Sequence, residues 1–223
     1  MDAAQTLAEV DRLRGRARAR AHGGVWLPAA LIALLLLLSI ALYRDPFHEP
    51  REIVGAHPSW AGLPDNQRSA TASYLFWFLA TPLTVAAIAA WYRWRERRSG
   101  MRVAWPLVAA TGLGVLVLLA VLAAIPHTPP PDTMTGDMPT FIWSGLLSPL
   151  VPVALAVIVL GRAERSWYLA VAGGWIAVLV VWLCGVPRLG AVPGGELALR
   201  PGHYVILMAL PLAAFATVRA LRR

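Results

Sequence analysis

Polar and charged residues divide the chain into six long apolar stretches. Each is close to the about 20 apolar residues that a helix needs to cross a hydrocarbon layer about 30 Å thick. A lone apolar strand would leave its backbone N–H and C=O groups unpaired in lipid, so we expect helices. The predicted spans are Val25 to Tyr43, Ala70 to Tyr92, Val103 to Ile125, Phe141 to Leu160, Trp167 to Val186 and His203 to Val218.

The segments between these spans alternate between short and long. The longer ones are rich in Pro or Gly and do not favour helix continuation; they are Arg44 to Ser69, Pro126 to Thr140 and Pro187 to Gly202. The sequence therefore predicts an all-α polytopic membrane helical bundle, with six transmembrane helices arranged as three hairpins. Residues 1–24 form a basic N-terminal segment, and residues 25–223 form a single six-helix transmembrane domain.

Composition and charge give this bundle an orientation. The chain is 58% hydrophobic and only 14% charged, which is too little charged surface for a soluble domain of this size. Its basic residues are all Arg, and 15 of the 20 lie on one side of the predicted membrane. Because Arg collects in cytoplasmic segments, we expect both termini in the cytoplasm and the protein in the cell membrane.

The N-terminal segment contributes five arginines to that side, namely Arg12, Arg14, Arg16, Arg18 and Arg20. We interpret them as an orientation signal for the first span, and they are also suited to holding anionic lipid. A cleaved signal peptide ending near Ser39 to Ala41 is the alternative; it would leave five spans and place the new N-terminus outside. The long basic region and the long apolar core favour retention.

The absence of Lys indicates GC-rich codon usage and a bacterial source. The Arg-only, Ala-, Leu- and Val-rich sequence resembles integral membrane proteins of high-GC actinobacteria. The resemblance is carried by Tyr74-Leu75-Phe76-Trp77, Thr81-Pro82 and Trp91-Tyr92-Arg93. It implies a membrane protein and brings no activity or cofactor with it.

Prolines at similar places in the second, fourth and sixth spans suggest an internal repeat: Pro82, Pro149 and Pro211. Inside a helix, each would remove one backbone hydrogen bond and favour a kink. Thr81 and Ser148, each preceding one of these prolines, are expected to satisfy the freed carbonyls. Three kinks at one depth would line a substrate pathway. The alternative is that Pro is simply common in transmembrane helices.

The predicted membrane interior holds no Asp, Glu, Arg or His, so a proton or ion relay is not expected. Ser144 and Ser148 have no base at matching depth, and haem ligation by paired His has no support. The outer segments hold His and carboxylates with irregular spacing, which favours solvated side chains over a metal site. The densest candidates are Asp45, His48, Glu49, Glu52 and His57.

The lack of an ion relay, of a base for serine and of haem ligands in the predicted spans favours a protein that is not an enzyme and has no cofactor. The predicted function is a non-catalytic accessory or partner subunit of a membrane assembly, such as an export or signalling complex. The alternative is a small permease or channel whose pathway passes Pro82, Pro149 and Pro211. The expected partners are the lipid bilayer and another membrane protein or further copies of this chain. Nucleic-acid binding is not expected, because no groove-reading element accompanies the arginines.

Overall fold

The computed structural model describes residues 5, 7–10, 12, 24–48, 60, 62–63, 67–99, 105–125, 147–185 and 200–221. Within this part of the chain the secondary structure is helical, apart from one isolated bridge between Tyr43 and Gln67. The elements are α2 (Trp26–Ser39), η1 (Ile40–Leu42), α3 (Ala70–Ser99), α4 (Trp105–Ala124), α6 (Leu150–Ala163), α7 (Trp167–Gly185) and α8 (Pro201–Leu221).

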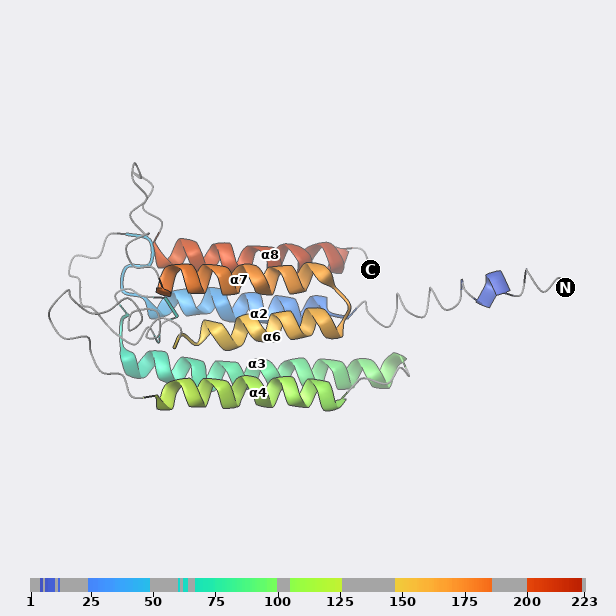
Figure 1. The fold of residues 1–223 in the computed structure, drawn as a ribbon, viewed down its shortest axis with the longest axis horizontal. Helices are drawn as coiled ribbons and strands as arrows, with labels where there is room; N and C mark the ends of the chain where they lie inside the picture. Colours follow the sequence, from blue (N-terminus) through green and yellow to red (C-terminus); the bar gives the residue numbers. More distant parts are fainter. Residues whose placement is uncertain are drawn as a thin grey trace.

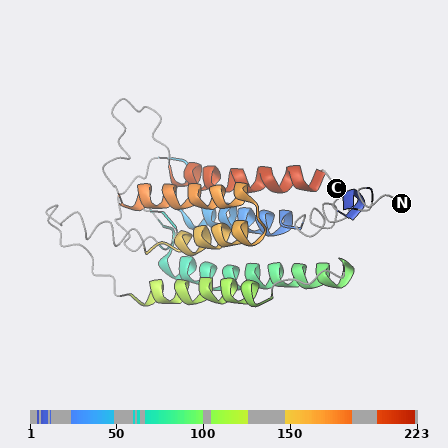
Figure 2. The same cartoon turned by 45° about the vertical axis from the view of Figure 1, so that its right-hand side comes forward.

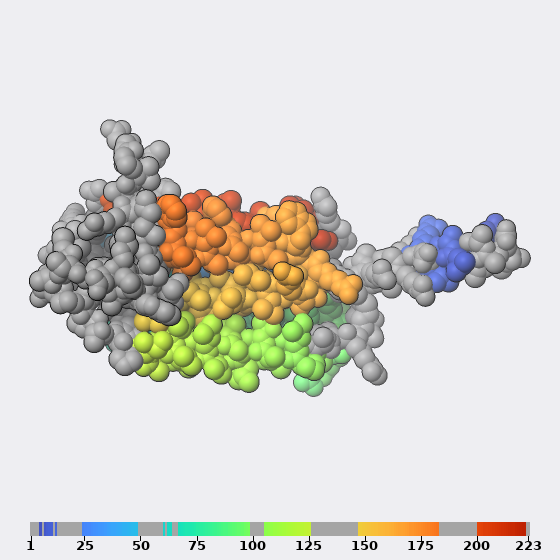
Figure 3. Space-filling model, viewed as in Figure 1, coloured from blue at the N-terminus to red at the C-terminus, as the bar shows by residue number. Residues whose placement is uncertain are grey.

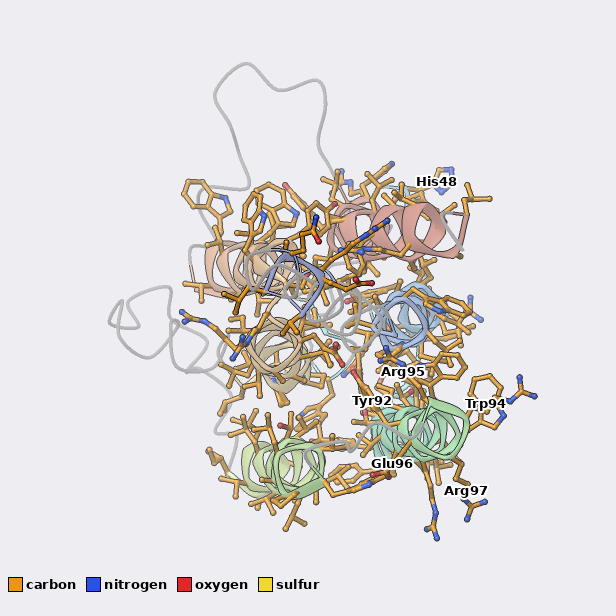
Figure 4. All side chains as sticks on the ribbon, turned by 90° about the vertical axis from the view of Figure 1, so that its right-hand side faces the viewer. His48, Tyr92, Trp94, Arg95, Glu96 and Arg97 are labelled. Atoms are coloured by element: carbon orange, nitrogen blue, oxygen red, sulfur yellow. The ribbon has the colours of Figure 1, made fainter. Side chains whose placement is uncertain are left out.

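The six long helices run side by side and alternate in direction along the chain (Figures 1 and 2). Viewed from one end, they form two rows of three (Figure 4). One row is α8, α2 and α3, and the other is α7, α6 and α4. The bundle therefore places every second helix end at the same end of the molecule, as the predicted order of connections requires.

The closest helix pairs are α6 with α7 and α2 with α8. Glycine makes the first approach possible, since a Cβ built on Gly173 would lie 2.7 Å from the backbone N of Ile158 and 3.0 Å from Ala154 O. A Cβ on Gly161 would lie 2.4 Å from the backbone N of Ala170. The pairs within each predicted hairpin are packed less closely, so the first and last helices, not sequence neighbours alone, hold the bundle together.

The core lies mainly among α2, α6, α7 and α8. Its fully buried side chains include Leu36, Val157, Ile176, Met208 and Leu212. The helices α3 and α4 form one side of the bundle and contribute fewer residues, chiefly Trp77 and Leu119. Because the core consists of aliphatic side chains together with a few aromatic ones, such as Trp60 and Trp77, packing rather than polar pairing fills the interior.

Apolar residues also cover the outside of the bundle. In Figure 3, α7, α6 and α4 form one continuous face. Exposed apolar side chains on these helices include Leu113, Val117, Leu155, Trp175 and Val178. Within the described residues, three helices are long and apolar enough to cross a membrane, with spans of Ala70–Arg98, Trp105–Ala124 and Pro201–Leu221, and α2, α6 and α7 are shorter apolar helices. The architecture is compatible with a membrane helical protein.

Two described helix ends differ from the predicted span limits. The predicted fourth span begins at Phe141, but the described helix α6 begins at Leu150, and residues 126–146 lie outside the described part of the chain. The second span was expected to end at Tyr92, whereas α3 continues to Ser99. Hydropathy places the apolar part of a segment, but helix ends depend on caps and local contacts that hydropathy does not report.

Candidate functional site

At the arginine-rich end of the bundle, three described side-chain hydrogen bonds join α3 to other segments. The helices α3, α6 and α8 all finish there, and α3 extends beyond its neighbours (Figure 1). Basic residues occupy the last turns of these three helices or the short turn after α6; those described are Arg93, Arg95, Arg97, Arg98, Arg162, Arg165 and Arg219. The predicted concentration of Arg at one end of the helices is therefore confirmed for the described residues.

The inner side of the α3 end is bonded to the rest of the bundle. Tyr92 is buried, and its hydroxyl donates a hydrogen bond of 2.7 Å to Oε1 of Glu164, in the turn after α6. Trp105 Nε1, at the start of α4, donates a hydrogen bond of 2.7 Å to Oε2 of Glu96. Both carboxylates on this side of the described structure thus accept hydrogen bonds from aromatic side chains.

The same side of α3 also contacts the start of α2. Trp91 Nε1 donates a 2.9 Å hydrogen bond to Gly24 O, and the Trp91 ring packs edge-on against Trp26 at 5.6 Å. The Arg95 guanidinium lies against Gly24, where a Cβ would come within 2.0 Å of one of its terminal nitrogens. A side chain at position 24 would displace Arg95, so the glycine leaves room for the cation.

The outer side of the α3 end faces away from the bundle. Arg93, Trp94, Arg97 and Arg98 are exposed, and Trp94 is 45% exposed. The Trp94 ring stacks on Trp91 at 4.9 Å, and the Arg98 guanidinium lies 4.5 Å from the Trp94 ring centroid. Figure 4 shows Trp94 and Arg97 pointing away from the helices, whereas Tyr92 and Arg95 point toward them.

The predicted outer His and carboxylate cluster is only partly within the described residues. Asp45 is half-buried and His48 is exposed; Glu49, Glu52 and His57 lie outside the described residues. Among the described residues, no three His, Cys, Asp or Glu side chains gather closely enough to hold a metal ion. The structure thus provides no geometry for a metal site at Asp45 and His48.

Another histidine, His203, acts as a helix cap at the start of α8. Its Nδ1 accepts a 3.1 Å hydrogen bond from the backbone N–H of Arg200, just before α8 begins at Pro201. Its ring also packs edge-on against Phe47 at 5.2 Å. This contact corresponds to one half of a capping box, in which a side chain of the first turn accepts a hydrogen bond from the backbone N–H of the residue before the helix.

The three prolines are not equivalent. Pro82 and Pro211 lie inside α3 and α8, as expected for these two positions. The prediction that Pro149 lies in mid-span is wrong, because Pro149 is the N-cap of α6. A proline just before or at a helix start removes no helical hydrogen bond, so no kink follows from it.

The helices that carry these prolines are not close neighbours. α3 packs against α2 and α4, α6 against α4 and α7, and α8 against α2 and α7. In Figure 4, α2 separates α3 from α8 within one row, and α6 lies in the other row. The structure therefore does not bring Pro82, Pro149 and Pro211 together around a common pathway.

The two hydroxyls expected to compensate for the prolines behave differently. Ser148 donates a hydrogen bond to Gly62 O, and its Oγ accepts a 3.2 Å hydrogen bond from the Leu150 N–H. It thus caps α6 and does not satisfy a carbonyl freed within a helix. Thr81 is buried, yet its Oγ1 has no hydrogen-bond partner in the described residues. The expected compensation is wrong for both side chains, because neither points at such a carbonyl.

A second aromatic cluster, at the opposite end, was not predicted. Trp60 is fully buried and stacks on Tyr74 at 4.6 Å and on Phe78 at 6.3 Å. Nearby, the Tyr43 hydroxyl accepts a 2.8 Å hydrogen bond from the Leu63 N–H. The signal available in the sequence was Trp60 itself. A side chain as large as that of tryptophan favours burial even in a connecting segment.

The remaining predicted residues are peripheral. Arg12 is exposed, and Arg14, Arg16, Arg18 and Arg20 lie outside the described residues. Ser144 also lies outside them, whereas Ser148 is engaged in capping and faces no described base.

Comparisons with known proteins give no relative: no family model, no curated protein and no solved structure matches the chain.

Proposed function

We propose that this protein is an integral membrane protein that crosses the cell membrane six times, with its arginine-rich end and both termini in the cytoplasm. What supports this orientation is the distribution of Arg over helix ends, described above, together with the alternating helix directions. Trp91, Trp94 and Trp105 lie at the same end, which suits the aromatic belt of a membrane interface.

Within that membrane, we propose a non-catalytic accessory or partner subunit of a larger assembly, such as an export or signalling complex. The observation that carries the proposal is the character of the interior. The buried polar side chains among the described residues are hydroxyls, namely Ser39, Ser73, Thr81 and Ser148, and no described Asp, Glu, Arg or His is buried. Such an interior offers no group for acid–base catalysis or for binding a driving ion.

The outer faces offer sites for a partner instead. The helix α4 lies at the edge of the bundle and is one of the least buried helices. Leu113, Val117 and Val121 are more than half exposed along it, and a Cβ on Gly114 would meet nothing within 4 Å. A small residue between apolar ones lets a second transmembrane helix approach closely.

The test is purification of the tagged full chain from its native membrane in mild detergent, with quantification of co-purifying proteins by mass spectrometry. We expect one companion at a fixed stoichiometry, either another membrane protein or further copies of this chain. Gly114→Leu should reduce recovery of the companion. Gly174→Leu is the matched control, because a Cβ on Gly174 also meets nothing within 4 Å, but on α7. A solitary monomer from wild-type membranes would contradict the proposal.

The permease or channel alternative has less support. It requires that Pro82, Pro149 and Pro211 line one pathway, and the helix arrangement separates them. The unpartnered Trp77 Nε1 and Thr81 Oγ1 on α3 are polar atoms inside the bundle, but they lie among apolar core residues. We therefore propose the subunit function alone.

A further inference from the structure

The outer side of the α3 end forms a compact surface of three arginines and one tryptophan. We call Arg93, Trp94, Arg97 and Arg98 the outer α3 patch, where outer means the side of α3 that is turned away from the other helices. We propose that this patch binds the phosphate headgroup of an anionic phospholipid in the leaflet that it faces. The inference goes beyond the subunit function, and it rests on the proposed orientation of α3 across the membrane.

The first argument is depth. The helix α3 has 30 residues, so it is about 45 Å long at a rise of about 1.5 Å per residue. That exceeds the about 30 Å of hydrocarbon in a bilayer. The apolar part of α3 ends near Trp91, and four of the six residues from Arg93 to Arg98 are arginines. The outer α3 patch therefore lies at headgroup depth, and Figure 1 shows that end of α3 extending past its neighbours.

The second argument is that α3 separates two sets of charged residues by face. Tyr92, Arg95 and Glu96 are spaced as one helical face and are directed to the bundle. Arg93, Arg97 and Arg98 lie on the opposite side and are exposed. In the described residues, no carboxylate forms an ion pair with these three arginines, because Glu96 and Glu164 are directed to Trp105 and Tyr92. Their guanidinium groups are available to a ligand.

The third argument is that contacts hold two members of the patch, Trp94 and Arg98, in place. Trp94 lies between the Trp91 ring, at 4.9 Å, and the Arg98 guanidinium, at 4.5 Å from its centroid. Trp91 in turn is held by its hydrogen bond to Gly24 O. Ordering side chains before binding reduces the entropy that a ligand must overcome. The exposed edge of Trp94 suits the boundary between acyl chains and headgroups.

The fourth argument concerns the charge of the ligand. Guanidinium groups match the geometry of phosphate oxygens through paired N–H donors. Arg93 and Arg97 are four residues apart, which places their Cβ atoms about 6 Å from each other, close enough to share one phosphate. A zwitterionic headgroup also carries an ammonium, which three arginines repel and no carboxylate on this face receives. The patch therefore selects phospholipids with net negative charge, even against the negative end of the helix dipole.

The experiment uses the full-length protein, purified in mild detergent and stripped of lipid. Native mass spectrometry measures binding of phosphatidylglycerol, and of phosphatidylcholine as the zwitterionic probe. We expect phosphatidylglycerol to bind at least about tenfold more tightly, since each Arg at a membrane surface contributes a factor of about five. Arg93→Gln/Arg97→Gln/Arg98→Gln should abolish that preference. Equal binding of the two lipids by the wild-type protein would overturn the proposal.

The matched control removes the same charge elsewhere. Arg162→Gln/Arg165→Gln/Arg219→Gln lowers the net charge equally at the same end of the bundle but outside the patch, and we expect it to keep most of the preference. An equal loss in this control would show general attraction to basic residues and would overturn the assignment to the patch. Trp94→Leu should weaken phosphatidylglycerol binding while leaving the charge unchanged.

A second variant keeps the proposal testable if the variant with three glutamines does not insert into the membrane in the correct orientation. Arg93→Lys/Arg97→Lys/Arg98→Lys keeps the positive charges needed for orientation but removes the paired guanidinium donors. We expect at least about threefold weaker phosphatidylglycerol binding, and unchanged binding would contradict a guanidinium site. Because lipid binding is measured on the isolated chain, its outcome is independent of whether a companion protein co-purifies.

Discussion

At the scale of single residues, glycine decides how closely the central helices approach. From the sequence alone, the glycines in the apolar spans have no assigned partner. The structure separates adjacent ones, since a Cβ on Gly173 would meet Ile158 and Ala154 within 3.0 Å, whereas Gly174 faces open space. Each of the two has its own role, because a helix turns by about 100° between neighbours and only one of them faces α6.

This difference gives a stability prediction for Gly173→Ala. The added methyl group must displace the α6 backbone, and overpacking of this kind costs about 1–3 kcal/mol. We expect a lower free energy of unfolding in detergent, measured by denaturant titration with circular dichroism. Gly174→Ala is the control, and it should be neutral or slightly stabilising because Ala favours helix. Equal stability of the two variants would contradict the α6–α7 packing.

Residue-scale chemistry was the least predictable from sequence. Ser148 was considered both as a nucleophile and as a partner for a freed carbonyl, and the structure assigns it to the α6 cap. His203, to which no role was assigned from the sequence, caps α8. The type of side chain was known in both cases, but its role depends on which backbone groups lie within hydrogen-bond distance, and only the folded chain specifies those.

At the scale of elements, the positions of helix ends determine what the prolines and aromatic residues do. Pro149 is the N-cap of α6 and does not interrupt it, because the described helix begins at Leu150. By contrast, α3 continues past the predicted span end at Tyr92 to Ser99, so the arginines that follow Tyr92 lie on the helix and not in a connecting segment. Hydropathy identified the apolar part of both segments, but it does not report where the helix in each segment begins or ends.

The extended end of α3 gives a prediction for Tyr92→Phe. This variant removes the hydroxyl that donates to Glu164 Oε1 and keeps the buried ring. A hydrogen bond to a charged group contributes about 1.5–3 kcal/mol, so we expect a loss of that order in unfolding free energy. Amide hydrogen exchange of the last turns of α3 should also become faster.

Tyr168→Phe is the control for this change. Its hydroxyl donates to Pro211 O at 3.3 Å, a longer and exposed hydrogen bond between α7 and α8. We expect a smaller loss of stability and unchanged exchange in α3. If Tyr92→Phe is no more destabilised than Tyr168→Phe, the contact between α3 and the α6–α7 turn does not stabilise the bundle.

At the scale of the whole molecule, the arrangement in two rows explains why one predicted pathway is not formed. Alternation along the chain puts the helices with Pro82, Pro149 and Pro211 in the same direction, but not next to one another. The closest contact between distant segments is instead between α2 and α8. The bundle is thereby closed by its first and last helices.

The proposed orientation predicts which positions are accessible from each side. In a Cys184→Ala background, we expect His48→Cys to react with a membrane-impermeant maleimide in intact spheroplasts. Arg97→Cys should react only after permeabilisation. Both side chains are exposed, and they follow or end helices at opposite ends of the bundle, so they form a matched pair. The reverse pattern of labelling would contradict the orientation taken from the arginines.

Sequence alone determined the helical class, the number of long apolar segments and the collection of arginines at alternate segment ends, because each follows from local composition summed along the chain. Helix pairing, the α6 start and the two faces of the α3 end were decided only by the tertiary structure. The physical reason is that the helices are apolar on nearly every side, outside as well as inside. An amphipathic stripe that would mark the buried face of a soluble helix is therefore missing. Glycine contacts, caps and aromatic hydrogen bonds select the neighbours instead, and these depend on residues far apart in the chain, such as Tyr92 and Glu164.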